Sequence, residues 1–585
     1  MRILVASLLS ILVILVWAKY YGPKPPVQPP HANRPIPAGP ATSGSPTAGS
    51  SERKGSQGAP AAVAAAPASV PRIADSEERT ITIENSLYRV EISNQGAVVK
   101  SWKLKKYTDD TKPPQKCRDG SNPPCVLDLV HQEASEQTGG WPFAIVLDDE
   151  QLQNAANGGL YRVSTPASTL AAPTDVEFIW SNGQLEVTKH FHFDHSYLVR
   201  AETSAKLNGN PTKAGLAWLG GFGDCTVANP APIDRVTTYY SEGGKITNYS
   251  YKKLEGLEKW GPGLWQGGKD FLGIEDTYFA AVFLPPNGAA PGTLETRYWK
   301  APQTVKLCEQ ATPEAVPEVA VASSSSTLGL RVYVGPKDYD DLKKMNPPLE
   351  GLVNFGWLAF IAEPLFHGLK WLHNYIPNWG WAIVALTLIL NMLLFPLRIS
   401  GYKTTLKMQR VAPQIKAIQD KYKKYSMRDP RKAEMNKEVM AIYSREGINP
   451  LGGCIPQLLQ FPIWFGLYRA LQGTIELRHA PWFGWITDLS AKDPYYILPL
   501  LMGLSMYLVS KMTPMTATDP QQQAMMKIMP IGMAAMFMVI PYPSGLAVYI
   551  LTSSVVGVAQ QWYLNRKHPL PAPGKPVRGK DEKKP

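Results

Sequence analysis

The sequence predicts a polytopic α-helical membrane protein with six spans and a large, exported all-β domain. One observation is a set of apolar stretches, of which one lies at the N-terminus and five lie after residue 378. A second is the alternation of apolar and polar residues between residues 77 and 340, the period of a half-buried strand. The third is charge: residues 1–340 carry 32 Lys and Arg against 34 Asp and Glu, whereas residues 341–585 carry 28 against 14. Basic and apolar character in one region is typical of helical membrane proteins, whose cytoplasmic loops concentrate Lys and Arg.

The composition excludes two other classes of protein. The chain has 585 residues, of which 44% are hydrophobic and 10% aromatic, so it can fill a sizeable core and is not fully disordered. Its five cysteines are too few for a small disulfide scaffold.

The N-terminal region predicts a membrane anchor followed by a tether. The apolar run ILVASLLSILVILVW is shorter than the ~20 residues of a span, but it suffices when it extends through Tyr21. A cleaved signal peptide is the alternative, although no small-x-small cleavage site follows the run closely. We therefore predict a retained signal anchor over residues 1–21. Residues 22–76 are rich in Pro, Ala, Gly and Ser and are predicted to form a tether, because they cannot bury enough apolar surface to fold.

Residues 77–340 are predicted to form an antiparallel β-domain, a large sandwich. TITIE, LYRVEIS and LEVTKHFHF alternate between apolar and polar residues, and Asn-Gly and Gly-Gly pairs mark the turns. Its four cysteines allow disulfides in an exported domain, and Cys117 and Cys125 are the easier pair because their loop is short. Three connectivities stay open from the sequence.

The segment HFHFDH lies on one of these predicted strands. His190 and His192 share a face of the strand and could bind a metal. An exposed strand face also tolerates histidine without any ligand, so no metal site is assigned from the sequence.

A connecting segment over residues 341–378 separates the β-domain from the apolar region. Within it, residues 350–376 are amphipathic and rich in aromatic residues, which predicts a helix lying in the membrane interface. The alternative is an ordinary segment of the β-domain.

The apolar region predicts five spans and fixes their orientation. The loop at residues 398–449 carries 13 Lys and Arg against 5 acidic residues, and the tail at residues 566–585 is also basic, so both should be cytoplasmic. They share that side only if the first of these spans enters from outside, which places the β-domain outside. The core therefore covers residues 379–565, with spans at about 379–397, 454–477, 495–513, 524–540 and 545–563.

The basic loop predicts an antiparallel helical hairpin. Apolar residues recur at spacings of three and four along each half, and Pro430 separates the halves. Its basic surface could meet anionic phospholipid or ribosomal RNA, whereas a solvated loop that only sets the topology is the alternative. The apolar seam favours a folded element and consists of Ile415, Ile418, Tyr422 and Tyr425 in the first half and Met435, Val439 and Ile442 in the second.

Polar side chains recur near the cytoplasmic ends of the predicted spans. Such groups are costly in lipid, so they predict a wet concavity in the inner leaflet. Hydrogen bonding between helices is the alternative. The residues are Asn391, Gln457, Gln460, Thr552, Ser553, Ser554, Gln560 and Gln561.

Arg469 lies well inside a predicted span, roughly 12 Å from its outer end. Snorkelling outward would remove much of the cost of burying its charge, and a role in the concavity is the alternative. Ten of the 17 methionines fall within Met502–Met538. Flexible thioether side chains suit a surface for varied apolar partners, although they also serve as ordinary span residues.

No motif of bond-making chemistry is present. The sequence contains no H-E-x-x-H, no Walker-type G-x-x-x-x-G-K-[ST] and no G-x-S-x-G. It therefore predicts no catalytic residue, no cofactor and no specific small-molecule substrate.

Five stretches resemble the YidC/Oxa/Alb family of membrane protein insertases. They are GPKDYDDLKKM, NWGWAI, INPLGGCIPQLLQFPIWFGLY, ELRHAPWFGWITDLSAKDPYYILPLLMG and PSGLAVYILTSS, in that order along the last 250 residues. The anchor, tether and exported β-domain resemble the Gram-negative YidC form, which implies a multi-pass protein of the bacterial inner membrane. The resemblance also implies that the periplasmic β-domain is a supersandwich similar to sugar epimerases.

The resemblance implies an action for the five-span core. The core would enclose a hydrophilic groove, open to cytoplasm and lipid, that takes a client's polar tail while the client's apolar segment slides into lipid. Partners would be nascent membrane proteins, the ribosome and the Sec translocon. The slide would run along the spans that start near Cys454 and Ala524, with apolar residues Phe461, Trp464, Phe465, Met529, Met533 and Phe537.

One residue departs from the family pattern. The family usually places Arg or Lys five residues before the proline that ends the first core span, and this chain has Asn391 there. Electrostatic attraction of acidic client tails at that position is therefore in doubt, although Asn391 can still hydrogen-bond and hydrate the groove. Two other functions are alternatives: a small-solute transporter, which predicts inverted repeats, and an envelope carbohydrate-binding protein or enzyme based on the β-domain.

Overall fold

The computed structural model describes most of the chain beyond the tether. Its described residues are 71–117, 120–227, 236–250, 265–306, 314–323, 327–425, 429–449, 455–513, 528, 532, 535–539 and 542–568. The predicted anchor, most of the tether, most of the basic tail and most of the span predicted at 524–540 lie outside these residues. So do Met529 and Met533, and the side chain of Gln457.

The β-domain contains the strands that the period of two predicts. β1 and β9 coincide with TITIE and LEVTKHFHF, and β2 begins one residue later than predicted. The bounds are β1 Thr80–Glu84, β2 Tyr88–Ser93, β3 Val98–Thr108, β4 Val126–Asp128, β5 Ala144–Val146, β6 Arg162–Val163, β7 Thr169–Ala171, β8 Thr174–Ser181, β9 Leu185–Phe193, β10 Leu198–Leu207, β11 Asn210–Thr212, β12 Gly215–Trp218, β13 Thr237–Glu242, β14 Lys245–Ser250, β15 Gln266–Lys269, β16 Phe271–Glu275, β17 Phe279–Leu284, β18 Leu294–Val305, β19 Glu314–Ser323 and β20 Thr327–Pro336.

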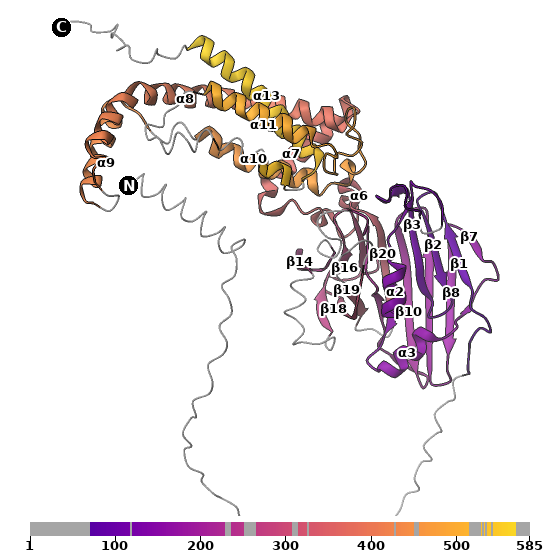
Figure 1. Ribbon diagram of the computed structural model, residues 1–585. Helices are drawn as coiled ribbons and strands as arrows, with labels where there is room; N and C mark the ends of the chain where they lie inside the picture. The colour runs from indigo at the N-terminus through magenta and orange to yellow at the C-terminus, as the bar shows by residue number, and fades with distance from the viewer. Residues whose placement is uncertain are drawn as a thin grey trace, which may run out of the picture. The chain divides into compact units, whose positions relative to one another are not determined.

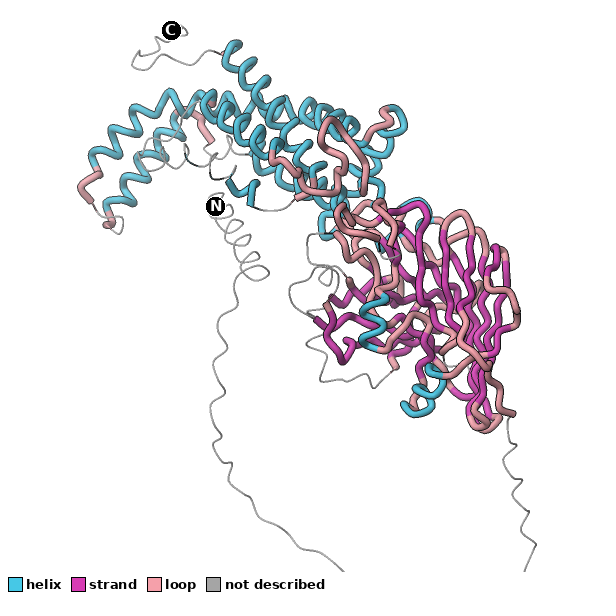
Figure 2. Tube along the Cα trace, turned by 45° about the vertical axis from the view of Figure 1, so that its right-hand side comes forward, coloured by secondary structure: helices cyan, strands magenta, loops and turns pink. Residues whose placement is uncertain are grey.

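The described strands form three sheets (Figures 1 and 2). The first sheet has the order β4-β3-β2-β1-β7, and the third has the order β15-β18-β19-β12-β5. The second sheet has ten strands in the order β14-β13-β16-β17-β20-β10-β9-β8-β6, with β11 added beside β10. Neighbouring strands are antiparallel except for β1 and β7. The antiparallel expectation is therefore met throughout these ladders, apart from that pair.

Aromatic residues of facing sheets make the core of the β-domain. Trp102 of β3 lies 6.4 Å from Phe193 of β9 between ring centroids, and 6.1 Å from Phe143. All three side chains are fully buried. Burying an aromatic side chain of this size contributes about 1.5–3 kcal/mol, so this layer is a main source of the domain's stability.

Lys189 is a charged residue on the buried face of β9. The alternation that buries Val187 and Phe191 also places Lys189 inside, where none of its surface is exposed. Its Nζ donates to the backbone carbonyl oxygens of Gly96, Ala97 and Phe143 at 2.7, 3.2 and 2.8 Å. These bonds offset the cost of burying an amine, and they tie β9 to the first sheet.

Two further observations concern the boundary with the tether and the cysteines of this domain. The tether was expected to reach residue 76, but the backbone of Ile73 already exchanges hydrogen bonds with Ser181 of β8 at 3.0 and 2.7 Å. Ile73 thus contacts the β-domain although it lies in the range predicted as tether, and the extent of the tether stays a prediction. Cys117 and Cys125 form a disulfide.

The remaining described elements are helical. Two short helices, α2 and α3, belong to the β-domain, and the others follow β20. The bounds are α2 Gln132–Thr138, α3 Glu150–Gly158, α6 Tyr339–Lys343, η2 Glu350–Leu352, η3 Gly356–Leu358, α7 Ala359–Tyr375, α8 Trp379–Lys421, α9 Arg431–Arg445, α10 Ile455–Gln472, η5 Ile475–Leu477, α11 Ile497–Met512 and α13 Ser544–Lys567.

The helix α8 continues 24 residues past the predicted span end at residue 397. It starts at the cap residue Asn378, whose Oδ1 accepts from the backbone N–H of Trp381 at 3.1 Å, and it includes Pro396 and Pro413. Hydropathy marks where lipid contact ends but not where the helix ends, so the first arm of the predicted hairpin is the second half of α8. Among the described helices, α8 is the one long and apolar enough to cross a membrane, and α11 is a shorter apolar helix.

The helix α7 is amphipathic, as the aromatic-rich stretch predicts. Phe366 and Leu369 are each 1% exposed and face the core, whereas Phe360 and Tyr375 are 72% and 70% exposed, and Trp357 of the preceding η3 is 85% exposed. Large aromatic side chains left uncovered in this way suit the boundary between lipid headgroups and hydrocarbon. The location of α7 at the interface stays a prediction.

We expect the Gly380→Ala substitution to destabilise the start of α8. A Cβ at residue 380 would lie 2.0 Å from Cδ1 of Trp482, so the indole must move. Overpacking of this kind costs about 1–3 kcal/mol. Thermal unfolding in detergent should show a lower midpoint. The matched control is Gly368→Ala on α7, where the nearest atom to a new Cβ is 3.8 Å away, so a midpoint at or above that of the parent is expected.

Candidate functional site

Two polar pairs link α8 to α13, and the pairs are spaced equally along both helices. Nδ2 of Asn391 donates to Oγ of Ser553 at 3.4 Å, and Nη1 of Arg398 donates to Oε1 of Gln560 at 2.8 Å. Asn391 and Arg398 are seven residues apart, as are Ser553 and Gln560. Seven residues are about two turns, so each helix presents both of its residues on one face. We call these four residues the α8–α13 ladder.

The ladder joins a third helix at Ser553. Nε2 of Gln460 on α10 donates to the same Ser553 Oγ at 3.2 Å. Asn391 also donates to the backbone carbonyl oxygen of Thr387 at 2.9 Å. Helices α8, α10 and α13 therefore meet around one hydroxyl, and their polar groups bond one another.

Arg398 is held flat against α13. Its Nη2 donates to the backbone carbonyl oxygen of Gly557 at 3.3 Å, and a Cβ at that glycine would lie 3.4 Å from both terminal nitrogens. The absence of a side chain there lets the guanidinium approach the helix backbone. Gln560 links this pair to the other, because its Nε2 donates to the backbone carbonyl oxygen of Asn391 at 3.3 Å. The cation is thus positioned by two residues of α13, and it remains half-buried.

Sequence reasoning missed Arg398, because hydropathy ended the span at residue 397 and made Arg398 the first residue of a loop. The usable signal was its spacing of seven from Asn391 along a helix that has no cap between them. The cation that the family resemblance implies at residue 391 is absent, and Arg398 lies seven residues, or about two turns, further along α8.

The structure brings together four of the predicted groove residues and separates others. Asn391, Gln460, Ser553 and Gln560 share the network, and Thr552 is half-buried beside Ser553. Gln561 instead donates to Asn565 at 3.0 Å, in a second group where Tyr402 also donates to Asn565 at 2.8 Å. Hydrogen bonding between helices, one of the two interpretations of these residues, is therefore present.

Arg469 lies away from the ladder. It is nine residues beyond Gln460 on α10, so the two are about 13 Å apart along the helix axis. Its exposed side chain passes Gly356 of η3, whose hypothetical Cβ would lie 3.4 Å from Nε. This placement fits a side chain that reaches outward and not one that enters the ladder.

The predicted slide residues fall into two groups. Phe461 and Phe465 on α10 are 51% and 44% exposed, and Trp464 packs edge-on against Phe465 at 4.7 Å. Phe537 is only 8% exposed and lies edge-on to Tyr542 at 5.6 Å, inside the helical core. Phe537 is therefore unsuited to a client surface, whereas the α10 face is open.

The second half of α8 and α9 form the predicted hairpin. Ile415 is buried and shares an apolar cluster with Val439, and Ile418 and Met435 are half-buried. Tyr422 is buried and its hydroxyl donates to Oε1 of Glu438 at 2.8 Å. The seam at spacings of three and four thus holds the two arms together.

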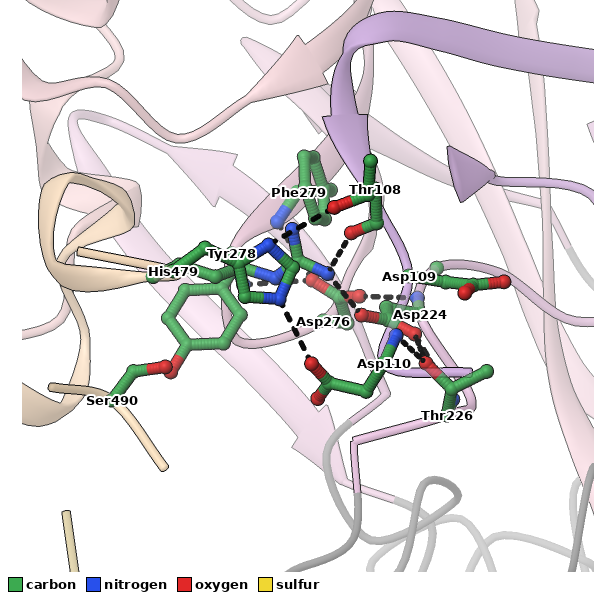
Figure 3. Close-up of polar contacts among 12 residues, drawn as sticks. Thr108, Asp109, Asp110, Asp224, Thr226, Asp276, Tyr278, Phe279, His479 and Ser490 are labelled. Carbon is green, nitrogen blue, oxygen red and sulfur yellow. Dashed lines mark hydrogen bonds and ion pairs between the residues drawn. The ribbon is translucent and has the colours of Figure 1, made fainter. Parts of the chain in front are cut away.

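A separate polar cluster joins the β-domain to residues 473–496, here called the α10–α11 loop (Figure 3). Nη2 of Arg478 lies 2.6 Å from Oδ2 of Asp224 and donates to the backbone carbonyl oxygen of Thr108 at 2.6 Å. The side chains of Arg478 and Asp224 are 3% and 1% exposed. Asp224 also receives its own support, because its N–H donates to Asp276 at 2.8 Å and Thr226 donates to its Oδ1 at 2.6 Å.

Two family models match the chain. One is described as the 60Kd inner membrane protein and matches residues 371–571, and the other is the YidC periplasmic domain and matches residues 80–368. The boundary between the two matches falls inside α7, so the β-domain and the helical core each correspond to a known module.

Curated relatives match almost the whole chain. A membrane protein insertase YidC of Geobacter sp. strain M21 is 34% identical over 83% of this chain and 86% of its own length. The insertase YidC of Syntrophus aciditrophicus is 30% identical over 97% of this chain and 99% of its own length. A solved structure of an active YidC insertase covers 85% of this chain and 95% of its own, at 16% identity and a TM-score of 0.33. On the identity and coverage of these relatives, the chain belongs to the YidC family of membrane protein insertases, inner-membrane proteins with a periplasmic β-domain that are not enzymes.

Proposed function

We propose that this insertase acts through a hydrophilic groove bounded by α8, α10 and α13. The observation that carries the proposal is the α8–α13 ladder, which gathers two amides, a hydroxyl and a guanidinium on facing helices of an apolar region. Polar groups are costly in lipid and are retained there mainly where they serve a pathway or pair with one another. A client's polar tail would exchange its bonds with water for bonds to these groups.

The groove lowers the barrier to insertion without supplying energy. A polar tail that enters it has a shorter apolar path to cross than one that crosses the full hydrocarbon layer. The net driving force is burial of the client's apolar segment in lipid. On this proposal the exposed face of α10, with Phe461 and Phe465, is the surface along which that segment leaves.

We propose that the chain is a multi-pass protein with six spans and that its β-domain is a supersandwich similar to sugar epimerases. The asymmetry of Lys and Arg supports the orientation, with the hairpin of α8 and α9 and the basic tail in the cytoplasm. The same basic surface supports contacts with the ribosome and with anionic phospholipid. The Sec translocon is proposed as a partner from the family resemblance alone.

Reconstitution tests the proposal. The purified chain is placed in liposomes and supplied with a short two-span client, and insertion is read from protease protection of the client. We expect insertion well above that of empty liposomes. Insertion equal to that of empty liposomes would contradict the proposal.

We expect Asn391→Leu to slow insertion about tenfold and Asn391→Arg to slow it less. Leucine removes the bonds to Ser553 and Thr387 and dries the groove, whereas arginine keeps donors there. A tenfold change corresponds to about 1.4 kcal/mol in the barrier. The control is Met392→Leu at the next residue, which is 71% exposed and takes no part in the ladder. Equal rates for the Asn391→Leu variant and the parent would show that hydration at this position is unimportant.

A further inference from the structure

His479 lies where the α10–α11 loop meets the β-domain (Figure 3). Its Nε2 is 2.8 Å from Oδ1 of Asp110 and 4.0 Å from Oδ2 of Asp488, and its Nδ1 is 3.1 Å from Oγ1 of Thr108. Asp110 follows β3, whereas His479 and Asp488 belong to the loop. The imidazole therefore stands between carboxylates of two parts of the chain.

The donor atoms of this cluster converge. Each of His479, Asp110 and Asp488 offers one ligand atom, and the three atoms lie within 4.8 Å of one another. Zn²⁺ binds nitrogen and carboxylate oxygen at about 2.0–2.2 Å, which in a tetrahedral site puts ligand atoms roughly 3.3 Å apart. Small side-chain movements would reach that spacing. We propose that His479, Asp110 and Asp488 form a binding site for a divalent transition metal of the Zn²⁺ class, which fastens the β-domain to the α10–α11 loop.

Neighbouring groups orient both loop ligands. With Thr108 Oγ1 accepting a hydrogen from Nδ1, the lone pair of Nε2 is left to face the carboxylates, an arrangement in which metal-binding histidines are commonly held. Oδ1 of Asp488 accepts from the N–H and hydroxyl of Ser490, each at 2.7 Å, and from the N–H of His479 at 3.1 Å. These bonds fix the carboxylate and leave its Oδ2 toward the ring.

Positive groups near the site compete with a metal for these carboxylates. The guanidinium of Arg478 is already engaged by Asp224. A proton on the imidazole is the competing occupant, since an imidazolium would also pair with Asp110.

A second group of His and Asp residues provides the comparison. His190 and His192, singled out by the motif HFHFDH, both contact Oδ1 of Asp175, at 3.4 and 2.9 Å. Within the described part of the chain, only the group at His479 brings three such donor atoms within 4.8 Å of one another. His190 and His192 on β9 thus belong to a group with residue types like those of the proposed site, but that group does not bring three donor atoms within 4.8 Å of one another.

The test is metal binding by the purified full-length chain without a histidine tag. After a chelator strips the protein, Co²⁺ is titrated in as a Zn²⁺ surrogate and followed by its visible absorption, and Zn²⁺ content is measured after dialysis. We expect about one site per chain and a higher midpoint of thermal unfolding with Zn²⁺. His479→Gln keeps a donor toward Asp110 but lacks the imidazole, so we expect binding at least tenfold weaker. The control, His192→Gln, should bind as the parent does.

A second variant distinguishes loss of metal binding from loss of folding. Asp488→Asn keeps Oδ1 as an acceptor for Ser490 and replaces Oδ2 with an amide, so it should also lose binding while its unfolding midpoint without metal stays near that of the parent. Absence of Co²⁺ absorption in the parent would overturn the proposal in favour of a proton at His479. So would unchanged binding in both the His479→Gln and Asp488→Asn variants, or loss of binding in the His192→Gln control.

Discussion

Replacing Arg478 with methionine is expected to lower the free energy of unfolding by about 3–5 kcal/mol. The reason is the buried position of the pair: Arg478 and Asp224 are 3% and 1% exposed and 2.6 Å apart. Methionine leaves the carboxylate of Asp224 without its cation and the carbonyl oxygen of Thr108 without its donor. Removing one partner of a buried ion pair costs more than the pair contributes, because the other charge stays desolvated.

Thermal and denaturant unfolding in detergent measure this effect. The double variant Arg478→Met with Asp224→Asn should recover part of the loss, since no unpaired charge remains. The matched control is Lys421→Gln in the exposed pair with Glu438, where a much smaller loss is expected. A loss at Arg478 no larger than that of the control would show that this buried pair does not stabilise the contact between the β-domain and the loop.

Replacing Arg398 with leucine is expected to slow the insertion of a client with an acidic tail at least tenfold, and that of a neutral-tailed client much less. Arg398 is the charged member of the α8–α13 ladder, and Gln560 and Gly557 hold it in place. In a region of low dielectric, a fixed guanidinium attracts a carboxylate far more strongly than it would in water. The family's usual cation position holds Asn391, so this attraction would act two turns nearer the hairpin.

Two further variants separate charge from hydrogen bonding. Arg398→Lys keeps the charge and should retain most activity on the acidic client, whereas Arg398→Gln can still donate to Gln560 but should behave like the Arg398→Leu variant. Lys403→Gln removes an exposed cation of the same helix and serves as the control. Equal losses on acidic and neutral clients would mean that Arg398 only holds α8 against α13.

The strands and the helical hairpin were predictable because both rest on local periodicity. Burial on β9 follows the alternation residue by residue, and Ile415 and Val439 meet as the seam predicts. Lys189 shows the limit of that reasoning. Its inward position follows from the period, but the three carbonyl groups that receive it come from residues 46 to 93 positions away.

The residues of the candidate sites were predictable from the sequence, but the contacts among these residues were not. Asn391, Gln460, Ser553 and Gln560 stood out because polar groups are costly in lipid, yet nothing local specified that they bond one another. Arg398 was missed because it comes directly after the apolar stretch that predicted the span. The contact of Arg478 with Asp224 joins residues 254 positions apart, and such a pair depends on the packing of whole domains.

Because α8 is one continuous helix, it also sets the direction in which the hairpin points. At about 1.5 Å per residue, its 43 residues follow a bent helix axis roughly 65 Å long (Figure 1). One residue inserted between Asn391 and Arg398 would rotate everything beyond it by about 100°. Arg398 would turn away from Gln560, and the hairpin would swing round the helix axis by the same angle. The number of residues between Asn391 and Arg398 therefore sets two directions together: the side of α8 on which Arg398 faces Gln560, and the direction in which the hairpin leaves α8.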